Sequence, residues 1–193
     1  DVNNSEKYRI LQNGIGTGYD DVTCGFISAF GMGWFMSGHT EKPSDEVVLE
    51  NYKKAEKAGY VDKGYVNYYD KIINMNGNLV QNLDDKDFAI RTGSGNDAEL
   101  NSRMMASLDQ GVFVIAHMNI GQEGKHKEWI RSYEKQNDRV FYKLVDSSTN
   151  NDAYVDSKNW NVYRKVDGKM VRSRTSNKKP YRVVNGVTIF QGY

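Results

Sequence analysis

The hydrophobic pattern of the chain changes its period at Gly111. Before this residue, apolar side chains recur at the three- and four-residue spacing of amphipathic helices, and after it they form short runs of strand length. Helices and strands that are segregated in this way are typical of an α+β fold with an antiparallel sheet. A chain of 193 residues fills one core, so we expect residues 1–193 to form a single domain.

The N-terminal part contains the helix signals. The segment Cys24–Met36 is apolar and interrupted by glycines, and it predicts a helix that starts at or next to the cysteine. Ser44 is a favourable N-cap, with acidic residues after it, and it predicts a second helix that ends near Ala58. Two further helices are expected over 68–75 and 96–108.

The C-terminal part is rich in β-branched and aromatic residues. The expected strands cover 112–118, 126–133, 139–145, 159–164, 170–174 and 181–190. A tight turn at Asp167-Gly168 joins the fourth of these strands to the fifth.

The composition favours a globular protein that does not span a membrane. Apolar residues make up 38% of the chain and charged residues 26%, and no run approaches the roughly 18 apolar residues of a membrane span. The chain starts at Asp1 and not at a methionine, which is the kind of start expected where a leader, a purification tag or a larger parent chain is removed. The compartment stays open, with a secreted or a phage-borne origin among the alternatives.

The only cysteine, Cys24, opens the first expected helix. A lone cysteine forms no internal disulfide, and a helix N-terminus lowers the pKa of a thiol through its partial positive charge and its amide groups. Gly25 would let a substrate backbone approach closely, and the glycine-rich segment 13–18 would form the adjoining wall of a cleft. These features predict a nucleophilic thiol, and the alternative is a thiol buried in the core.

A nucleophilic thiol needs a base, and the chain has three histidines. His39 lies in a turn, and His117 lies within an apolar strand, where a packed ring is the simpler interpretation. His126 begins the next strand after a glycine-bearing loop, so it would stand at a sheet edge that faces the helix of Cys24. Asp146 follows the next apolar strand, and an antiparallel neighbour at that point would lie beside His126.

Gln12 and Asn13 are the side-chain amides best placed in the sequence to help the Cys24 amide stabilise an oxyanion, and the sequence does not choose between them. No Cys or His pair has the spacing of a zinc site. The glycines of 14–18 follow no strong strand, and no acidic partner follows them in a βαβ frame. We therefore expect neither a metal nor a nucleotide cofactor.

The order of these motifs resembles the papain-like cysteine peptidases, and more narrowly their C39-like bacterial and phage branch. The shared features are a Thr-Cys-Gly-x-x-Ser segment that opens a helix, a helical middle, a His after a glycine-bearing turn, and a strand that ends in Val-Asp-Ser-Ser. The resemblance implies a papain-like α+β fold, in which an N-terminal helical part carrying Cys24 packs on a C-terminal antiparallel β-sheet carrying His126 and Asp146. It also implies the catalytic order Cys, His, Asp.

The residues and the resemblance together predict a cysteine-nucleophile hydrolase that acts on a peptide or a related amide. One alternative is a catalytically inert module of the same fold that binds a partner through aromatic and basic side chains. A second alternative is a phage or bacterial hydrolase of peptidoglycan stem peptides. The oligomeric state stays open.

One segment is strongly basic, although the net charge of the chain is only +1. Between Arg164 and Arg182 it holds eight cationic side chains and a single acidic residue, Asp167. Such a segment either contacts a polyanion, such as nucleic acid, a teichoic polymer or an acidic protein surface, or forms the solvated face of a hairpin.

Chromatography on immobilised heparin separates these two interpretations. A polyanion site from Arg164 to Arg182 should retain the protein at low salt and release it steeply as salt rises, because association releases bound counterions. If retention does not change with salt, or if the protein is not retained at low salt, the interpretation as a solvated hairpin face would be favoured.

Overall fold

The structure, a computed structural model, describes residues 5–82, 88–89, 97–119, 125–148, 152–174, 178 and 180–192. Its α-helices are α1 (Cys24–Met36), α2 (Asp45–Lys57), α3 (Tyr69–Ile73) and α4 (Asp97–Asp109), and its 3-10 helices are η1 (Ser5–Tyr8) and η2 (Asn74–Asn76). Its strands are β1 (Val61–Asp62), β2 (Tyr65–Val66), β3 (Val80–Asn82), β4 (Phe88–Ala89), β5 (Val114–Asn119), β6 (Lys125–Gln136), β7 (Arg139–Val145), β8 (Ala153–Asp156), β9 (Asn161–Val166), β10 (Lys169–Arg172), β11 (Val183–Thr188) and β12 (Phe190–Gly192).

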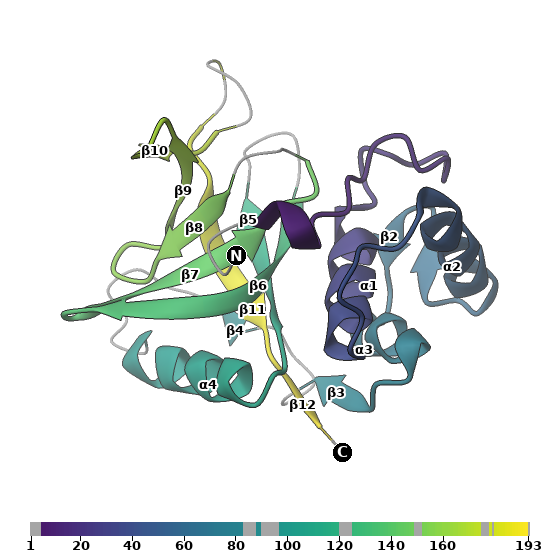
Figure 1. Cartoon of the computed structure of the whole chain (residues 1–193), viewed down its shortest axis with the longest axis horizontal. Helices are drawn as coiled ribbons and strands as arrows, with labels where there is room; N and C mark the ends of the chain where they lie inside the picture. The colour runs from purple at the N-terminus through teal and green to yellow at the C-terminus, as the bar shows by residue number, and fades with distance from the viewer. Residues whose placement is uncertain are drawn as a thin grey trace.

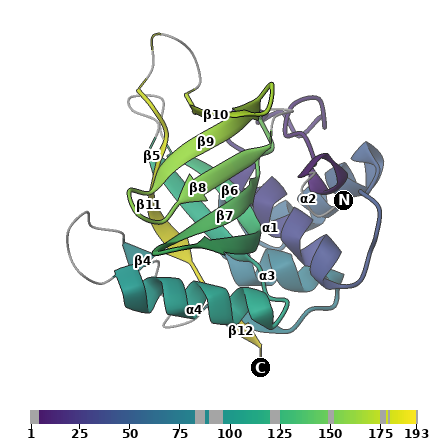
Figure 2. The same ribbon diagram turned by 60° about the vertical axis from the view of Figure 1, so that its left-hand side comes forward.

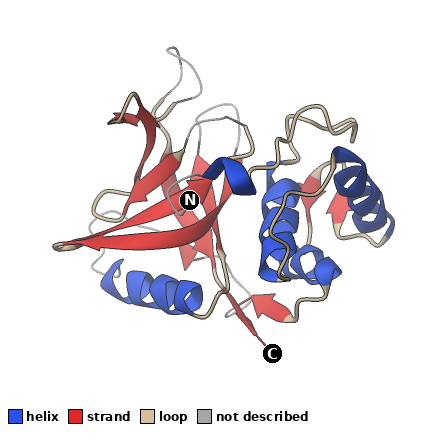
Figure 3. Cartoon of the chain, in the orientation of Figure 1, coloured by secondary structure: helices blue, strands red, loops and turns tan. Residues whose placement is uncertain are grey.

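Six of the strands close into an antiparallel barrel, whose arrangement can be followed in Figures 1 and 3. The largest sheet has the strand order β10-β9-β8-β7-β6-β5-β11-β4, and β9 also pairs with β11 through Asn161 and Val183. This additional pairing joins the two ends of the run from β9 to β11. Closure gives each of the six strands a strand neighbour on both sides, as in other antiparallel barrels.

The expected papain-like fold class is therefore wrong. We expected an N-terminal helical part packed on a C-terminal antiparallel β-sheet, and the structure has a closed six-stranded barrel with few helices. Two features escaped the sequence pattern. β8 is only four residues long, and the pairing of Asn161 with Val183 joins residues that are distant in the sequence.

Several local predictions are confirmed. α1 has the expected bounds, and β7 covers the expected seven residues. The Ser44 hydroxyl accepts a hydrogen bond from the Val47 N–H at 3.3 Å, so it caps α2 as its position indicated. The helix expected over 68–75 divides into α3 and η2. α4 begins at Asp97, and Asn96 lies outside the described residues.

Side chains inside the barrel form one core, and α4 covers one end of it (Figure 2). Met118, Ile130, Leu144 and Val184 belong to this core, together with Leu100 and Met104 of α4. Since strand residues alternate between faces, Glu128, Asp146 and Arg182, each two positions from one of these residues, also face the interior. The end of the barrel opposite α4 is therefore lined by the residues at the start of β6, after β7 and before β11.

The helix α1 packs on the outer surface of the barrel. Ile115, Trp129 and Val145 face outward and share a second core with Phe26 and Phe30 of α1. Nearly every residue of α1 is buried, because α2 and α3 cover its other sides (Figure 1). Close packing of α1 on α3 requires a glycine at position 33, where a Cβ would lie 2.6 Å from the Ile73 carbonyl oxygen.

Within the described part of the chain, no helix has both the length and the apolar character needed to cross a membrane.

Substitutions of two glycines in α1 test this packing. Gly33→Ala should lower the free energy of unfolding by roughly 1–3 kcal/mol, because its new methyl group would overlap a backbone oxygen. At Gly31 the nearest atom to a new Cβ is the Trp129 Nε1 at 3.3 Å, a side-chain atom that can shift. Urea unfolding should therefore find Gly31→Ala clearly more stable than Gly33→Ala, and equal stability would contradict the packing.

Candidate active site

The N-terminus of α1 places the only thiol of the chain at the barrel. The first backbone bond of the helix runs from the Ile27 N–H to the Thr23 carbonyl at 2.9 Å. The amides of Cys24, Gly25 and Phe26 therefore precede the intrahelical ladder, as in any first helical turn. Cys24 is 5% exposed, and its side chain lies at the positive end of the helix dipole.

α1 docks on β6 beside Lys127. The ladder between β6 and β7 starts at Trp129 and Val145, two residues past Lys127, so α1 takes the place of β7 at this point. The Ser28 hydroxyl donates to the Lys127 carbonyl at 3.2 Å, and the Lys127 N–H donates to the sulfur of Cys24. Ser28 lies one helical turn after Cys24, on the same face of α1.

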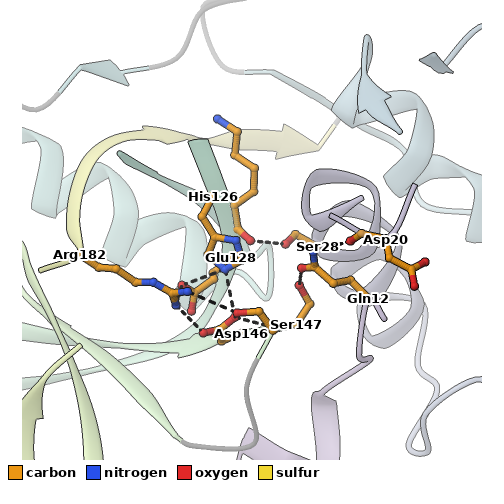
Figure 4. Close-up of polar contacts among 10 residues, drawn as sticks. Gln12, Asp20, Ser28, His126, Glu128, Asp146, Ser147 and Arg182 are labelled. Carbon is orange, nitrogen blue, oxygen red and sulfur yellow. Dashed lines mark hydrogen bonds and ion pairs between the residues drawn. The ribbon is translucent and has the colours of Figure 1, made fainter. Parts of the chain in front are cut away.

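His126 lies next to this docking point and faces the barrel interior, two and four positions before the buried residues Glu128 and Ile130. Its Nε2 lies 3.0 Å from Asp146 Oδ1 (Figure 4), and its ring also forms a hydrogen bond with Cys24. Because Nε2 faces Asp146, Nδ1 is the nitrogen that faces the thiol. The structure thus brings Cys24, His126 and Asp146 together, in the order expected from the sequence.

Asp146 is buried and fully bonded. Oδ1 accepts from His126, from the Ser148 N–H at 2.8 Å and from the Ser148 hydroxyl at 2.7 Å, and Oδ2 accepts from Arg182 at 2.8 Å. The carboxylate therefore orients the imidazole and closes the turn after β7. Although burial alone would raise it, the pKa of Asp146 lies well below its usual range, because His126, Arg182 and Ser148 stabilise the anion.

The charges favour a thiolate–imidazolium pair. Burial raises the pKa of Cys24, but the hydrogen bond and charge of His126 and the N–H and charge of Lys127 more than offset it, so the thiol pKa is lowered. Burial lowers the pKa of His126, but its bonds to Asp146 and Cys24 outweigh burial and raise this pKa to about 10. At neutral pH the proton therefore resides on His126.

Two charged residues of the site were not predicted. Glu128 is 0% exposed and lies 3.6 Å from His126 Nε2, and Arg182 is 5% exposed and lies 3.8 Å from Glu128. The pKa of Glu128 is raised to about 8, chiefly by burial and by the charge of Asp146. Period-two alternation was the available signal, because Glu128 is two residues from His126 and Arg182 is two residues from the core residue Val184.

The position of Arg182 also changes the interpretation of the basic segment. Its guanidinium lies inside the site, so it does not contribute to an exposed cationic surface. The polyanion contact stays a prediction for the rest of the segment from Arg164, in which Lys179 lies outside the described residues.

The two expected oxyanion residues lie in different environments. Gln12 is buried: its Nε2 donates to the Asp20 carbonyl at 2.7 Å, and its Oε1 accepts from the Ser147 hydroxyl at 2.7 Å. Gln12 thereby ties the segment that leads into α1 to the turn that follows Asp146. Asn13 is exposed.

Gly25 and His117 are both enclosed by other residues of the chain. A Cβ at Gly25 would lie 3.1 Å from Val66 and 3.2 Å from the Tyr69 hydroxyl, so the chain itself, and not a substrate backbone, approaches this glycine. The His117 ring is buried, bonded through Nε2 to the Thr188 hydroxyl at 2.5 Å and through Nδ1 to the Lys127 ammonium. His39 is exposed and stacks on Trp34.

The same buried cluster offers donor atoms of the kind that bind metals. One atom each of His126, Glu128 and Asp146 lie within 4.8 Å of one another. Arg182 already supplies a cation at 2.8 Å from Asp146, and Asp146 Oδ1 is engaged by three donors. A metal ion in this cluster would have to displace these bonds and would face the guanidinium.

No family model matches the chain, and no curated protein or solved structure is similar enough to it to count as a match.

Arg182→Met tests the charge balance of the site. Removal of the guanidinium leaves Asp146 buried without its closest cation, so the free energy of unfolding should fall by about 3–5 kcal/mol in guanidinium chloride at neutral pH. Arg103→Met removes an exposed ion pair with Glu99 and should cost less than about 1 kcal/mol. Equal stability of the two variants would contradict this account.

Proposed function

We propose that the protein is a cysteine-nucleophile hydrolase that acts on a peptide or a related amide. The observation that carries this proposal is the buried array in which the Cys24 thiol bonds to His126 and His126 Nε2 lies 3.0 Å from Asp146. A thiol with a lowered pKa, an adjacent imidazolium and an orienting carboxylate are the three groups that nucleophilic thiol catalysis needs.

In the proposed reaction, the Cys24 thiolate attacks the carbonyl carbon, and the carbonyl oxygen becomes an oxyanion. His126 then gives its proton to the leaving nitrogen, and the C–N bond breaks. The neutral imidazole next takes a proton from water, which attacks the thioester and releases the acid. Asp146 keeps the ring in the orientation that both proton transfers need.

The oxyanion needs two donors near the sulfur. The Cys24 N–H precedes the helical ladder at the positive end of α1, and it is the first donor. Gln12 is the second donor in this proposal, because one hydrogen of its Nε2 is engaged by Asp20 and the other remains. Asn13 is the alternative second donor.

The array supports a class of reaction and does not select a substrate. Proteins, peptides and peptidoglycan stem peptides all contain the amide that the mechanism cleaves. An inert binding module is the competing function, and the reactivity of Cys24 separates it from a hydrolase.

Alkylation of the single thiol is the first test. Iodoacetamide at about pH 6 should modify wild-type Cys24 rapidly, because a thiolate exists at that pH only when its pKa is lowered. Loss of the imidazolium in His126→Ala should slow the reaction by at least about tenfold, while His39→Ala, an exposed ring outside the site, should react like the wild type. Intact-mass spectrometry measures each rate, and a wild type that reacts no faster than His126→Ala would favour the binding module.

Turnover is the second test, with fluorescein-labelled casein and a fluorogenic peptide-amide library as substrates. Cys24→Ser should reduce the rate by about 10³-fold or more with little loss of stability, and His126→Ala should reduce the rate by a similar factor, because such residues act as a unit. Asp146→Asn should cost about 10²- to 10⁴-fold, depending on the tautomer that the amide imposes. If the His126→Ala variant keeps its activity and a folded His117→Ala variant loses it, the general base would be His117 and not His126.

A further inference from the structure

Glu128 occupies an unusual position at the floor of the site. Its side chain is fully buried, and neither of its carboxyl oxygens forms a hydrogen bond within the described residues. Figure 4 shows it between His126 and Arg182, the two cationic groups that bond to Asp146. A buried carboxyl group without hydrogen bonds is costly, so its retention beside a reactive array calls for an explanation.

We propose that Glu128 is a positioning residue: as a neutral acid it leaves His126 and Arg182 to Asp146, and once ionised it competes with Asp146 for both. The inference rests on the proposed hydrolase function, in which His126 must keep its orientation. The ion-pair partners of Glu128 are His126 and Arg182, so it acts on the reaction through His126.

The distances show that this competition is close. The Glu128 carboxyl lies 3.6 Å from His126 Nε2, and Asp146 lies 3.0 Å from the same atom. Because Coulomb energy falls as the inverse of distance, an ionised Glu128 would attract the imidazolium about four fifths as strongly as Asp146 does. Arg182 is subject to the same competition, at 3.8 Å from Glu128 and 2.8 Å from Asp146.

The charged groups around Glu128 balance only while it is neutral. His126 shares its strand, Asp146 follows β7, Arg182 precedes β11, and Arg9 follows η1. Cys24 of α1 lies one step further, beyond the His126 ring. Arg9 pairs with Asp152 at 3.7 Å. Three anions (Cys24, Asp146 and Asp152) therefore face three cations (His126, Arg182 and Arg9), and ionisation of Glu128 adds a fourth anion to the site.

The pKa values set the pH range of the effect. The pKa of Glu128 is raised to about 8 and that of His126 to about 10. Glu128 is therefore neutral at pH 7 and ionises before the imidazolium loses its proton. In the wild type, kcat/KM should fall as pH rises through about 8, and without an ionisable group at position 128 it should fall only near 10.

Glu128→Gln is the decisive variant, because it removes the ionisation and keeps the size of the side chain. At about pH 9 its kcat/KM for fluorescein-labelled casein, relative to its own value at about pH 7, should exceed that of the wild type by about tenfold. Glu134→Gln, the same change at an exposed position of β6, should keep the wild-type profile. A folded Glu128→Gln protein with the wild-type descending limb would overturn the inference.

A second readout does not depend on turnover. The downfield NMR resonance of the His126 Nε2–H reports its bond to Asp146. In the wild type this resonance should shift or broaden as pH rises through about 8, and in Glu128→Gln it should persist toward about 10. If no casein is cleaved but the resonance behaves in this way, the proposed function fails and the positioning role stands. If casein is cleaved and the resonance titrates identically in both proteins, the positioning role fails alone.

Infrared spectroscopy of the wild type covers the case in which Glu128→Gln does not fold. The stretch of the protonated Glu128 carboxyl, identified by isotope-labelled glutamate, should disappear as pH rises through about 8. A band already absent at pH 7 would overturn the inference, because Glu128 would then be ionised in the working site.

Discussion

The arrangement of the site depends on where β7 stops. β7 leaves β6 after Val145 pairs with Trp129, and α1 fills the space beside Lys127 through Ser28 and Cys24. Because one helical turn separates Ser28 from Cys24, the bond of Ser28 fixes the height of the thiol along the strand. His126 is the preceding residue of that strand, so the docking of the helix also sets the distance between the thiol and the imidazole. Had β7 continued, it would have displaced α1 and drawn Asp146 into the ladder.

Burial strengthens the attraction between the charged groups of this array, and it also makes each unpaired charge costly. Charges at the mouth of a closed barrel are screened less than charges on a surface, so the attraction of Asp146 for His126 is strong. The same environment penalises every uncompensated charge. Asp146 meets this demand by accepting four hydrogen bonds, whereas Glu128 meets it through a raised pKa that favours its neutral form. The two pKa shifts are linked, because the charge of the ionised Asp146 adds to burial in raising the pKa of Glu128.

The sequence predicted individual helices and strands better than it predicted the closure of the barrel. α1, α2 and β7 follow from caps and periodicity, which depend on neighbouring residues. Strand order was enough to select His126 and Asp146, because an antiparallel hairpin brings the end of one strand beside the start of its neighbour. Glu128 and Arg182 were missed because they meet only across the closed barrel mouth. Their partners depend on the pairing of β9 with β11, which no local pattern encodes.

Two adjacent residues close the barrel and neutralise the charge of Asp146. Val183 pairs with Asn161 and completes the barrel, and Arg182, the residue before it, bonds to Asp146 and lies beside Glu128. The interior core formed by Met118, Leu144 and Val184 then excludes water beneath both carboxyl groups. The strand that seals the core therefore also carries the cation that holds Asp146, and Asp146 in turn orients His126.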